Sequence, residues 1–276
     1  MFLTRVKSSA VLVLVVVPTL LLGHEWLYVL LFCAAAIGLL EFYKTTGVQT
    51  DEHLIMGAMG YMSAATYYLL LYTGMKQYGL MLILLYLVGV LAVFVLMFPK
   101  YSAQQVFAAV IGVVYVPVMM GCIIQLRELP YGIYLVWLIF ISSWITDSCA
   151  YLAGRAFGRH KLAPILSPKK TIEGAVGGLL GAGLVALIYG LVLQFGVRIT
   201  LPGRYRIPIV LVVLVVSVVG GVISMLGDLA ASGIKRNYDC KDYGNLIPGH
   251  GGILDRFDSV IFTAPVIYYL CSFIMK

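Results

Sequence analysis

Charged residues are scarce in this sequence. Lysine, arginine, aspartate and glutamate make up 11% of the 276 residues, whereas 62% are hydrophobic and the mean hydropathy is +1.00. So little charge excludes an ordinary soluble domain. At ~20 residues per span, the chain has room for roughly eight to ten membrane helices and for no separate soluble domain. The composition therefore predicts one integral membrane domain over residues 1–276.

Several residue patterns that mark common kinds of site are also missing. The five cysteines are scattered without a CxxC pair, and no two histidines stand at metal-ligand spacing, which argues against a zinc site or a disulfide framework. No GxxxxGK[ST] is present to form a P-loop, and no GxSxG to form a serine-hydrolase elbow. Any nucleotide chemistry must therefore use another arrangement.

Nine apolar runs divide the chain, and most of them approach the ~20 residues that cross a bilayer as a helix. The runs are 10–22, 26–43, 54–72, 78–98, 106–124, 131–153, 174–195, 207–229 and 253–275. No small-x-small cleavage pattern follows the first run, so we interpret the first two as a retained helical hairpin turning near Gly23. We expect Pro117 to kink the fifth helix. The fold class predicted is an all-α polytopic membrane protein with about nine transmembrane helices.

The basic residues predict an orientation. With a cytoplasmic amino terminus and nine spans, thirteen of the nineteen lysines and arginines fall on the cytoplasmic side. Arg198, Arg204 and Arg206 share one external loop and run against this trend. We therefore expect a multi-pass protein of the inner (plasma) membrane, with N-terminal helices over 1–130. Its active site would face the cytoplasm from helices and loops in 131–276.

The stretch 232–258 breaks the apolar pattern. It carries four of the nineteen basic and four of the twelve acidic residues within 27 positions. Charge of both signs between two apolar runs suits a polar-substrate site at a membrane surface. Gly249, Gly251 and Gly252 surround His250, and such glycines let backbone approach a phosphate closely and adopt positive φ.

The fixed positions of this stretch resemble the signature of phosphatidate cytidylyltransferases, the enzymes that make CDP-diacylglycerol. Those positions are Ser232, Lys235-Arg236, Lys241-Asp242, His250-Gly251-Gly252, Asp255-Arg256 and Asp258. The stretches Trp144-x-x-Asp147-Ser148 and Ser167-Pro-Lys169-Lys170-Thr-x-Glu-Gly174 are similar to segments of the same family. The resemblance covers roughly residues 144–258.

The resemblance implies transfer of a cytidylyl group from CTP to phosphatidate, with Mg²⁺ as cofactor and K⁺ as a candidate second cation. The catalytic residues would be Lys235, Asp255 and Arg256 within the signature, together with Asp228, which is assigned from its position at the end of the eighth apolar run. The metal ligands would be Asp228, Asp255 and Asp258. The substrates would contact Asp147, Ser167, Lys169, Lys170, Ser232, Arg236, Lys241, Asp242, His250, Gly251 and Gly252.

Plainer roles stay open for several of these residues. Lys169 and Lys170 could be headgroup anchors, and Asp258 could cap a helix. His250 could only brace its loop. An ion pair with Lys235 would account for Asp228 without a metal.

Two helix faces carry small or polar residues. One stripe recurs at steps of three and four through Ser217, Gly221, Ser224, Asp228, Ser232 and Lys235, provided that the eighth helix continues past 229. Such a face is expected to meet protein or a hydrated cavity. The other holds GxxxG spacings at 174/178 and 177/181, which allow close helix packing within the chain or in a homodimer.

Other functions remain as alternatives. A CTP-dependent polyprenol kinase or another lipid cytidylyltransferase would use similar groups. A membrane transporter would use Asp147 and Asp228 as coupling residues, but it predicts polar residues in both halves of the membrane. CDP-alcohol phosphotransferases carry an Asp-Gly-x-x-Ala-Arg pattern that is missing here. The expected partners are CTP, phosphatidate and membrane lipids, with no nucleic acid.

Overall fold

The computed structural model describes residues 2–50, 54–199, 208–247, 249 and 251–275. Within these ranges the chain forms nine helical rods, some of which include 3-10 or π-helical segments. The rods are α1 (Phe2–Leu22); α2 (His24–Thr45); α3 (Ile55–Tyr72); η1 (Lys76–Tyr78) with α4 (Gly79–Leu96); α5 (Ala103–Val113), η2 (Val114–Val118) and α6 (Met119–Arg127); α7 (Gly132–Leu135), α8 (Trp137–Phe140), η3 (Ile141–Ile145) and α9 (Thr146–Phe157); α10 (Ile172–Leu191) with η4 (Val192–Val197); α11 (Ile209–Asn237); and α12 (Leu254–Ile274).

The helical fold class is confirmed, and each rod falls on one of the nine apolar runs. Among the described residues, seven helices are long and apolar enough to cross a membrane. The apolar part of α1, Ala10–Leu22, is shorter than that. Gly23, at φ 67°, joins α1 to α2, which confirms the expected turn. Pro117 lies in the π-helical segment η2, where the regular hydrogen-bond ladder is interrupted.

One short hairpin of β-strands interrupts the helices. Strand β1 (Lys161–Ala163) pairs antiparallel with β2 (Ser167–Thr171), directly before α10. Lys169 and Lys170 both lie on β2, ahead of α10 and not in its first turn. Thr171 caps α10 by accepting the N–H of Gly174 at 3.1 Å.

The chain divides into two compact units. The first comprises Met1–Ile124 and Asn237–Phe257, and the second comprises Gln125–Arg236 and Asp258–Lys276. The chain therefore passes from the second unit to the first and back again within the stretch 232–258.

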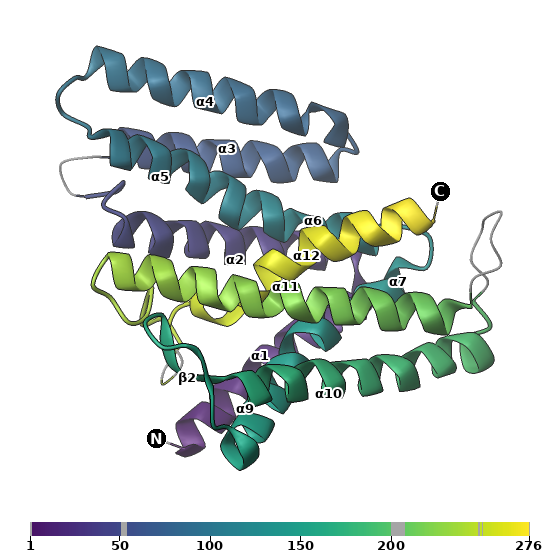
Figure 1. Cartoon of the computed structure of the whole chain (residues 1–276). Coiled ribbons are helices and arrows are strands. Elements are labelled where there is room, and N and C mark those ends of the chain that lie inside the picture. Colours follow the sequence, from purple (N-terminus) through teal and green to yellow (C-terminus); the bar gives the residue numbers. More distant parts are fainter. Residues whose placement is uncertain (1, 51–53, 200–207, 248, 250, 276) are drawn as a thin grey trace. The chain divides into compact units, whose positions relative to one another are not determined.

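Tyr43 on α2 organises the core of the first unit. Its hydroxyl donates to the carbonyl oxygen of Ala109 at 2.8 Å and lies 3.1 Å from the hydroxyl of Tyr86. Gly60 and Gly112 leave room for the ring, because a methyl group at either position would collide with it. A buried tyrosine with its hydroxyl paired joins α2, α4 and α5 without an unsatisfied polar group. Figure 1 shows α3, α4 and α5 side by side in this unit.

Glycines on α10 bring it close to α9 in the second unit. A methyl group at Gly178 would lie 2.8 Å from the carbonyl oxygen of Thr146, and one at Gly174 would lie 2.8 Å from that of Ala150. Gly181 packs in the same way against Cys149. The GxxxG spacing therefore serves packing within the chain, while the homodimer stays a prediction.

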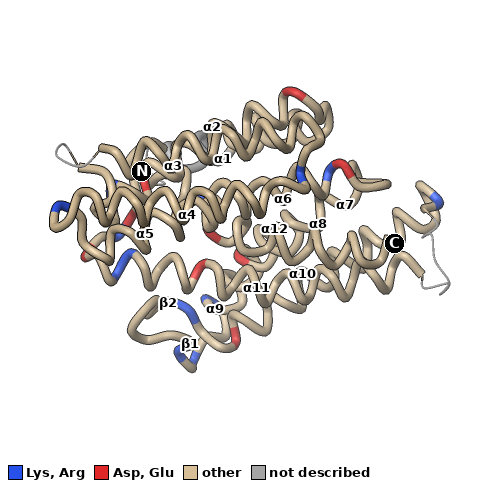
Figure 2. The backbone as a smooth tube through the Cα atoms, turned by 90° about the horizontal axis from the view of Figure 1, so that it is seen from above, with Lys and Arg blue, Asp and Glu red and all other residues tan. Residues whose placement is uncertain are grey.

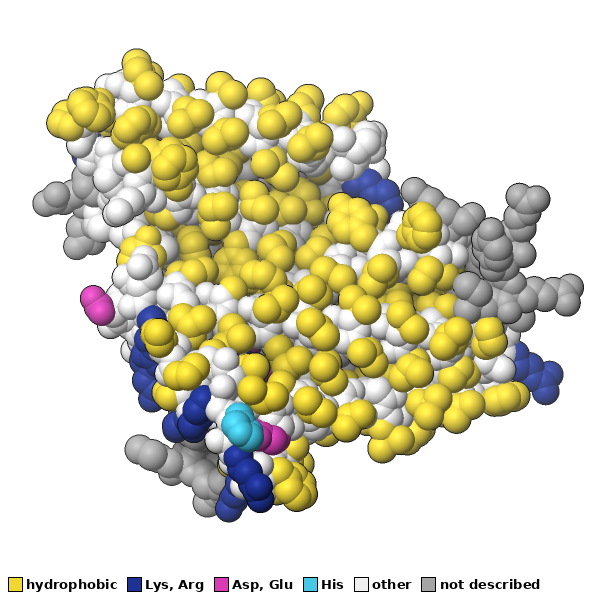
Figure 3. All heavy atoms as spheres, in the orientation of Figure 1, with side chains coloured by type: hydrophobic (Ala, Val, Ile, Leu, Met, Phe, Trp, Pro, Cys, Tyr) yellow, Lys and Arg dark blue, Asp and Glu magenta, His cyan; other side chains and the backbone are white. Residues whose placement is uncertain are grey.

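Hydrophobic side chains cover the helices where they are not packed against one another. Figure 3 shows them over the visible faces of α4 in the first unit and of α10 in the second. Basic residues lie around the β-hairpin instead (Figure 2), and Figure 3 shows basic side chains there. This distribution suits helices in hydrocarbon with a charged segment at the membrane surface.

Candidate functional site

The loop between α11 and α12, residues 238–253, is named the signature loop here and belongs to the first unit. Asp255, in the first turn of α12, is 6% exposed. Its Oδ2 accepts the backbone N–H of Tyr243 at 2.8 Å and that of Gly252 at 3.0 Å. One carboxylate oxygen thus ties the loop to the start of α12 at two points, Tyr243 and Gly252.

Glycines in the signature loop meet two different needs. Gly249 and Gly251 adopt φ of 77° and 85°, which confirms the expected positive φ. A methyl group at Gly251 would also lie 2.7 Å from Asp255 Oδ2. Gly252 is buried against the carboxyl group of Glu41, where a methyl group would collide. Gly252 is therefore needed for the contact with α2.

A polar hollow of about 590 Å³ opens at the signature loop. The described residues that line it are Lys241, Asp242, Asn245, Ile247, Gly249, Gly251 and Arg256. Lys241 is exposed, whereas Arg256 is half-buried. The Nε of Arg256 is buried and has no hydrogen-bond partner among the residues that the structure describes. A lysine and an incompletely paired guanidinium at one hollow can bind an anionic group.

Glu41 is a site residue that the sequence reasoning missed. It lies on α2, it is 5% exposed, and its Oε1 and Oε2 accept the N–H groups of Ile253 at 3.0 Å and Leu254 at 2.8 Å. The positions are 212 and 213 residues apart. The signal that could have found it is an acidic residue inside an otherwise apolar run, since such residues need a partner in a membrane.

The second unit holds its own group of charged side chains, named the charged cluster here. Its members are Asp147 on α9, Lys170 on β2, Asp228, Ser232 and Lys235 on α11, and Asp258 on α12. Helix α11 runs unbroken to Asn237, so the polar stripe is continuous, as expected, and Ser217 and Ser224 are fully buried.

Asp228 is held by two neighbours within the charged cluster. Lys170 Nζ forms an ion pair with Asp228 Oδ2 at 2.5 Å, and the hydroxyl of Ser232 lies 3.5 Å from Oδ1. Both charged side chains are about one quarter exposed. The cation that contacts Asp228 is therefore Lys170, on a strand, and the two lysines of β2 differ because Lys169 is exposed.

Asp258 and Asp147 complete the charged cluster. Asp258 lies close enough to Asp228, Lys235 and Asp147 to interact with them electrostatically. Ser259 donates its hydroxyl to Asp147 Oδ2 at 3.3 Å and its N–H to Asp258 Oδ1 at 2.8 Å. Asp258 thus lies within electrostatic reach of one carboxylate on α9 and another on α11, and Lys170 pairs with the latter.

The predicted site residues are accordingly distributed between two groups. Lys241, Asp242, Gly251, Gly252, Asp255 and Arg256 lie at the signature loop of the first unit. Asp147, Lys170, Asp228, Ser232, Lys235 and Asp258 lie in the charged cluster of the second. Ser167 is half-buried, Arg236 is exposed at the end of α11, and His250 lies outside the described residues.

The charged cluster has the donor type that Mg²⁺ prefers, because carboxylate oxygens are hard ligands. In the described part of the chain, no three His, Cys, Asp or Glu side chains are already placed as a ligand set. The residues therefore fit the ion by chemistry, and Lys170 now occupies one oxygen of Asp228.

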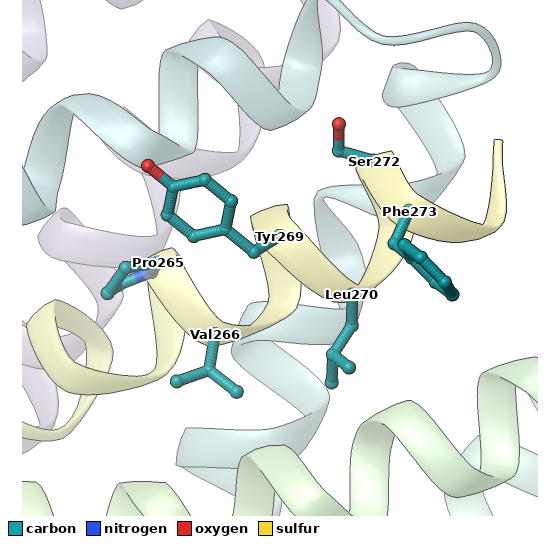
Figure 4. A pocket seen from close by; sticks show the side chains of 6 residues that line it. All are labelled: Pro265, Val266, Tyr269, Leu270, Ser272 and Phe273. Carbon is teal, nitrogen blue, oxygen red and sulfur yellow. The ribbon is translucent and has the colours of Figure 1, made fainter. Parts of the chain in front are cut away.

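An apolar hollow of about 580 Å³ lies along α12 in the second unit (Figure 4). Its lining is Pro265, Val266, Tyr269, Leu270, Ser272 and Phe273. It carries no charged side chain, so it cannot supply the groups that phosphate chemistry needs.

Comparison with known proteins adds independent findings. A sequence model described as "Cytidylyltransferase family" matches residues 3–274. The chain is 40% identical over 173 residues to a phosphatidate cytidylyltransferase of Bacillus subtilis, covering 62% of this chain and 60% of that protein. It is 40% identical over 139 residues to that of Staphylococcus saprophyticus, covering 50% and 49%. With the enzyme of Rickettsia bellii it shares 36% over 167 residues, or 60% and 70%. The first two matches thus span about half to three fifths of those relatives.

Proposed function

The chain belongs to the cytidylyltransferase family, and on that basis we propose that it transfers a cytidylyl group from CTP to phosphatidate. The products are CDP-diacylglycerol and pyrophosphate. The observation that carries the proposal is the family match over 3–274, together with cationic side chains at the polar hollow of the signature loop. The names of the three relatives supply the lipid substrate.

The reaction needs little from an acid or base. An anionic phosphate oxygen of phosphatidate attacks the α-phosphorus of CTP, and the bond from that phosphorus to the oxygen shared with the β-phosphorus breaks. The electron pair leaves with pyrophosphate. Because the nucleophile is already anionic at neutral pH, catalysis rests on positioning and on neutralising phosphate charge.

Each group of residues, taken by itself, carries cations that could neutralise phosphate charge. Lys241 and Arg256 at the hollow would bind nucleotide phosphates, with Arg256 able to engage two oxygens at once. In the charged cluster, Lys170 and Lys235 would bind phosphate oxygens. Asp228 would hold Lys170 in place between turnovers.

Magnesium fits the same cluster. The carboxylates of Asp228 and Asp258 would hold it, with Asp147 beside them. When bound, the ion supplies positive charge for the phosphate oxygens. Asp255 uses one of its oxygens on two backbone N–H groups. This arrangement favours a scaffolding role over the part in metal binding that the sequence predicted.

We also propose that the amino terminus and the signature loop face the cytoplasm, where CTP is available. The excess of basic residues on that side supports this orientation. In a cysteine-free background, single cysteines at Asn245 and Ser167 should react with an impermeant reagent from the cytoplasmic side, and one at Gln77 from the other side. Labelling of position 245 from outside would reverse the orientation.

The function is tested with purified protein, Mg²⁺, CTP labelled at either the α- or the γ-phosphorus, and either phosphatidate or a polyprenol as the acceptor. We expect the α-label to enter lipid and the γ-label to leave as pyrophosphate, with chelator abolishing both. Transfer of the γ-label to a polyprenol would instead identify a CTP-dependent kinase.

A further inference from the structure

Glu41 makes the longest-range polar contact to the signature loop that the structure describes. Its two carboxyl oxygens accept the N–H groups of Ile253 and Leu254, at the point where α12 begins. The first N–H groups of a helix have no partner inside the helix. Ile253, which precedes α12, has no polar side chain to cap it. The cap therefore comes from α2.

Glu41 also fills the space left by two glycines. A methyl group at Gly244 would lie 2.6 Å from Glu41 Oε1, and one at Gly252 would collide with the whole carboxyl group. The loop thus packs against the Glu41 carboxyl group at two places, Gly244 and Gly252. Aromatic packing of Phe42 on Tyr243, with ring centroids 6.4 Å apart, fixes the same segment to α2.

We propose that Glu41 is a positioning residue for the reaction. By holding the first turn of α12, it sets the direction of Arg256. Arg256 follows Ile253 by three residues and Leu254 by two. It also fixes Gly252, whose own N–H is bound by Asp255. Glu41 itself contacts backbone and not substrate, so it acts through Arg256 and the hollow. The expected effect of Glu41 on turnover rests on the proposed function.

The space that Glu41 occupies and the hydrogen bonds that it accepts can be separated by substitution. Glu41→Gln keeps the size but offers one acceptor oxygen, and its NH₂ group faces a backbone N–H. Glu41→Leu keeps much of the bulk and offers no acceptor. Glu25→Gln on the exposed first turn of the same helix is the matched control.

The experiment measures hydrogen exchange of the segment 242–257 and steady-state kinetics in the purified full chain. We expect exchange there to rise about tenfold in Glu41→Gln and further in Glu41→Leu, with the core of α2–α5 unchanged. The value of kcat/KM for CTP should fall in the same order, by about tenfold and then about a hundredfold. Glu25→Gln should match the parent in both.

Three results would overturn the proposal. They are parental exchange and kinetics in Glu41→Gln, equal behaviour of the Gln and Leu variants, and faster exchange throughout the first unit, which would make Glu41 a general packing residue. A parent without CTP turnover would refute the proposed function, yet the exchange data would still decide whether Glu41 holds the loop.

Discussion

The carboxylates at the signature loop and Asp228 in the charged cluster have different partners. At the signature loop, Asp255 and Glu41 accept backbone N–H groups, and the cations Lys241 and Arg256 line the hollow. In the charged cluster, Asp228 pairs with a lysine. Asp255 and Glu41 therefore hold the backbone of the signature loop in shape, whereas Asp228 holds the ammonium group of a lysine. The same residue type within one short stretch serves a scaffold in one place and electrostatics in the other.

The largest expected effect comes from removing charge in the second unit. Asp228→Asn keeps the shape but loses the ion pair with Lys170 and a ligand for Mg²⁺, so turnover should fall about a thousandfold or more and the Mg²⁺ requirement should rise. Asp258→Asn should behave alike, and the double variant should be little worse because the groups act as a unit. Asp239→Asn, at an exposed position of the signature loop with φ of 50°, is the control.

Asp255 offers the sharpest test of the comparison. An asparagine can place its oxygen where Oδ2 accepts two N–H groups, whereas alanine cannot. If scaffolding is its role, Asp255→Asn should stay within about tenfold of the parent and Asp255→Ala should lose about a hundredfold. An Asp255→Asn enzyme as impaired as Asp228→Asn, with a raised Mg²⁺ requirement, would return Asp255 to the metal site that the sequence suggested.

The two lysines of β2 provide a matched pair with a smaller effect. Lys170→Gln removes the partner of Asp228 and should lower kcat/KM about tenfold or more, whereas exposed Lys169→Gln should change it less than about threefold. Steady-state rates with both substrates varied would show the difference. Equal losses would mean that both lysines bind phosphate, and parental rates in both would assign them to anchoring.

The smallest effect on catalysis is expected from the helix packing beneath the charged cluster. Gly178→Ala forces a methyl group against the backbone of α9 and should destabilise the protein by about 1–3 kcal/mol. Gly183→Ala, on the same helix, meets its nearest atom at an ordinary 3.6 Å and should be neutral. Thermal unfolding in detergent measures both, and a neutral Gly178→Ala would mean that α9 and α10 can separate at little cost.

The sequence was sufficient for features that depend on local order. Helix hydrogen bonds are made within four residues, so apolar runs located all nine rods, and Gly249 and Gly251 were correctly expected at positive φ. Contacts between distant segments were harder. The partner of Asp228 was expected to be Lys235 or a metal, and it is a lysine on a strand that no apolar run predicts. Glu41 was overlooked because its target is backbone, which leaves no pattern of side chains to match.

Helix α2 carries both Glu41, which holds the signature loop, and Tyr43, which organises the core of the first unit. The two residues are two positions apart. Each residue inserted into an α-helix turns everything beyond it by about 100° and shifts it by about 1.5 Å. A single insertion or deletion between the buried residues Leu27–Ala35 and Glu41 would thus put either that upstream face or the contacts of Glu41 and Tyr43 out of register. Surface loops tolerate changes in length more readily than a packed helix does, which makes the length of this helix a family trait to look for when related chains are aligned.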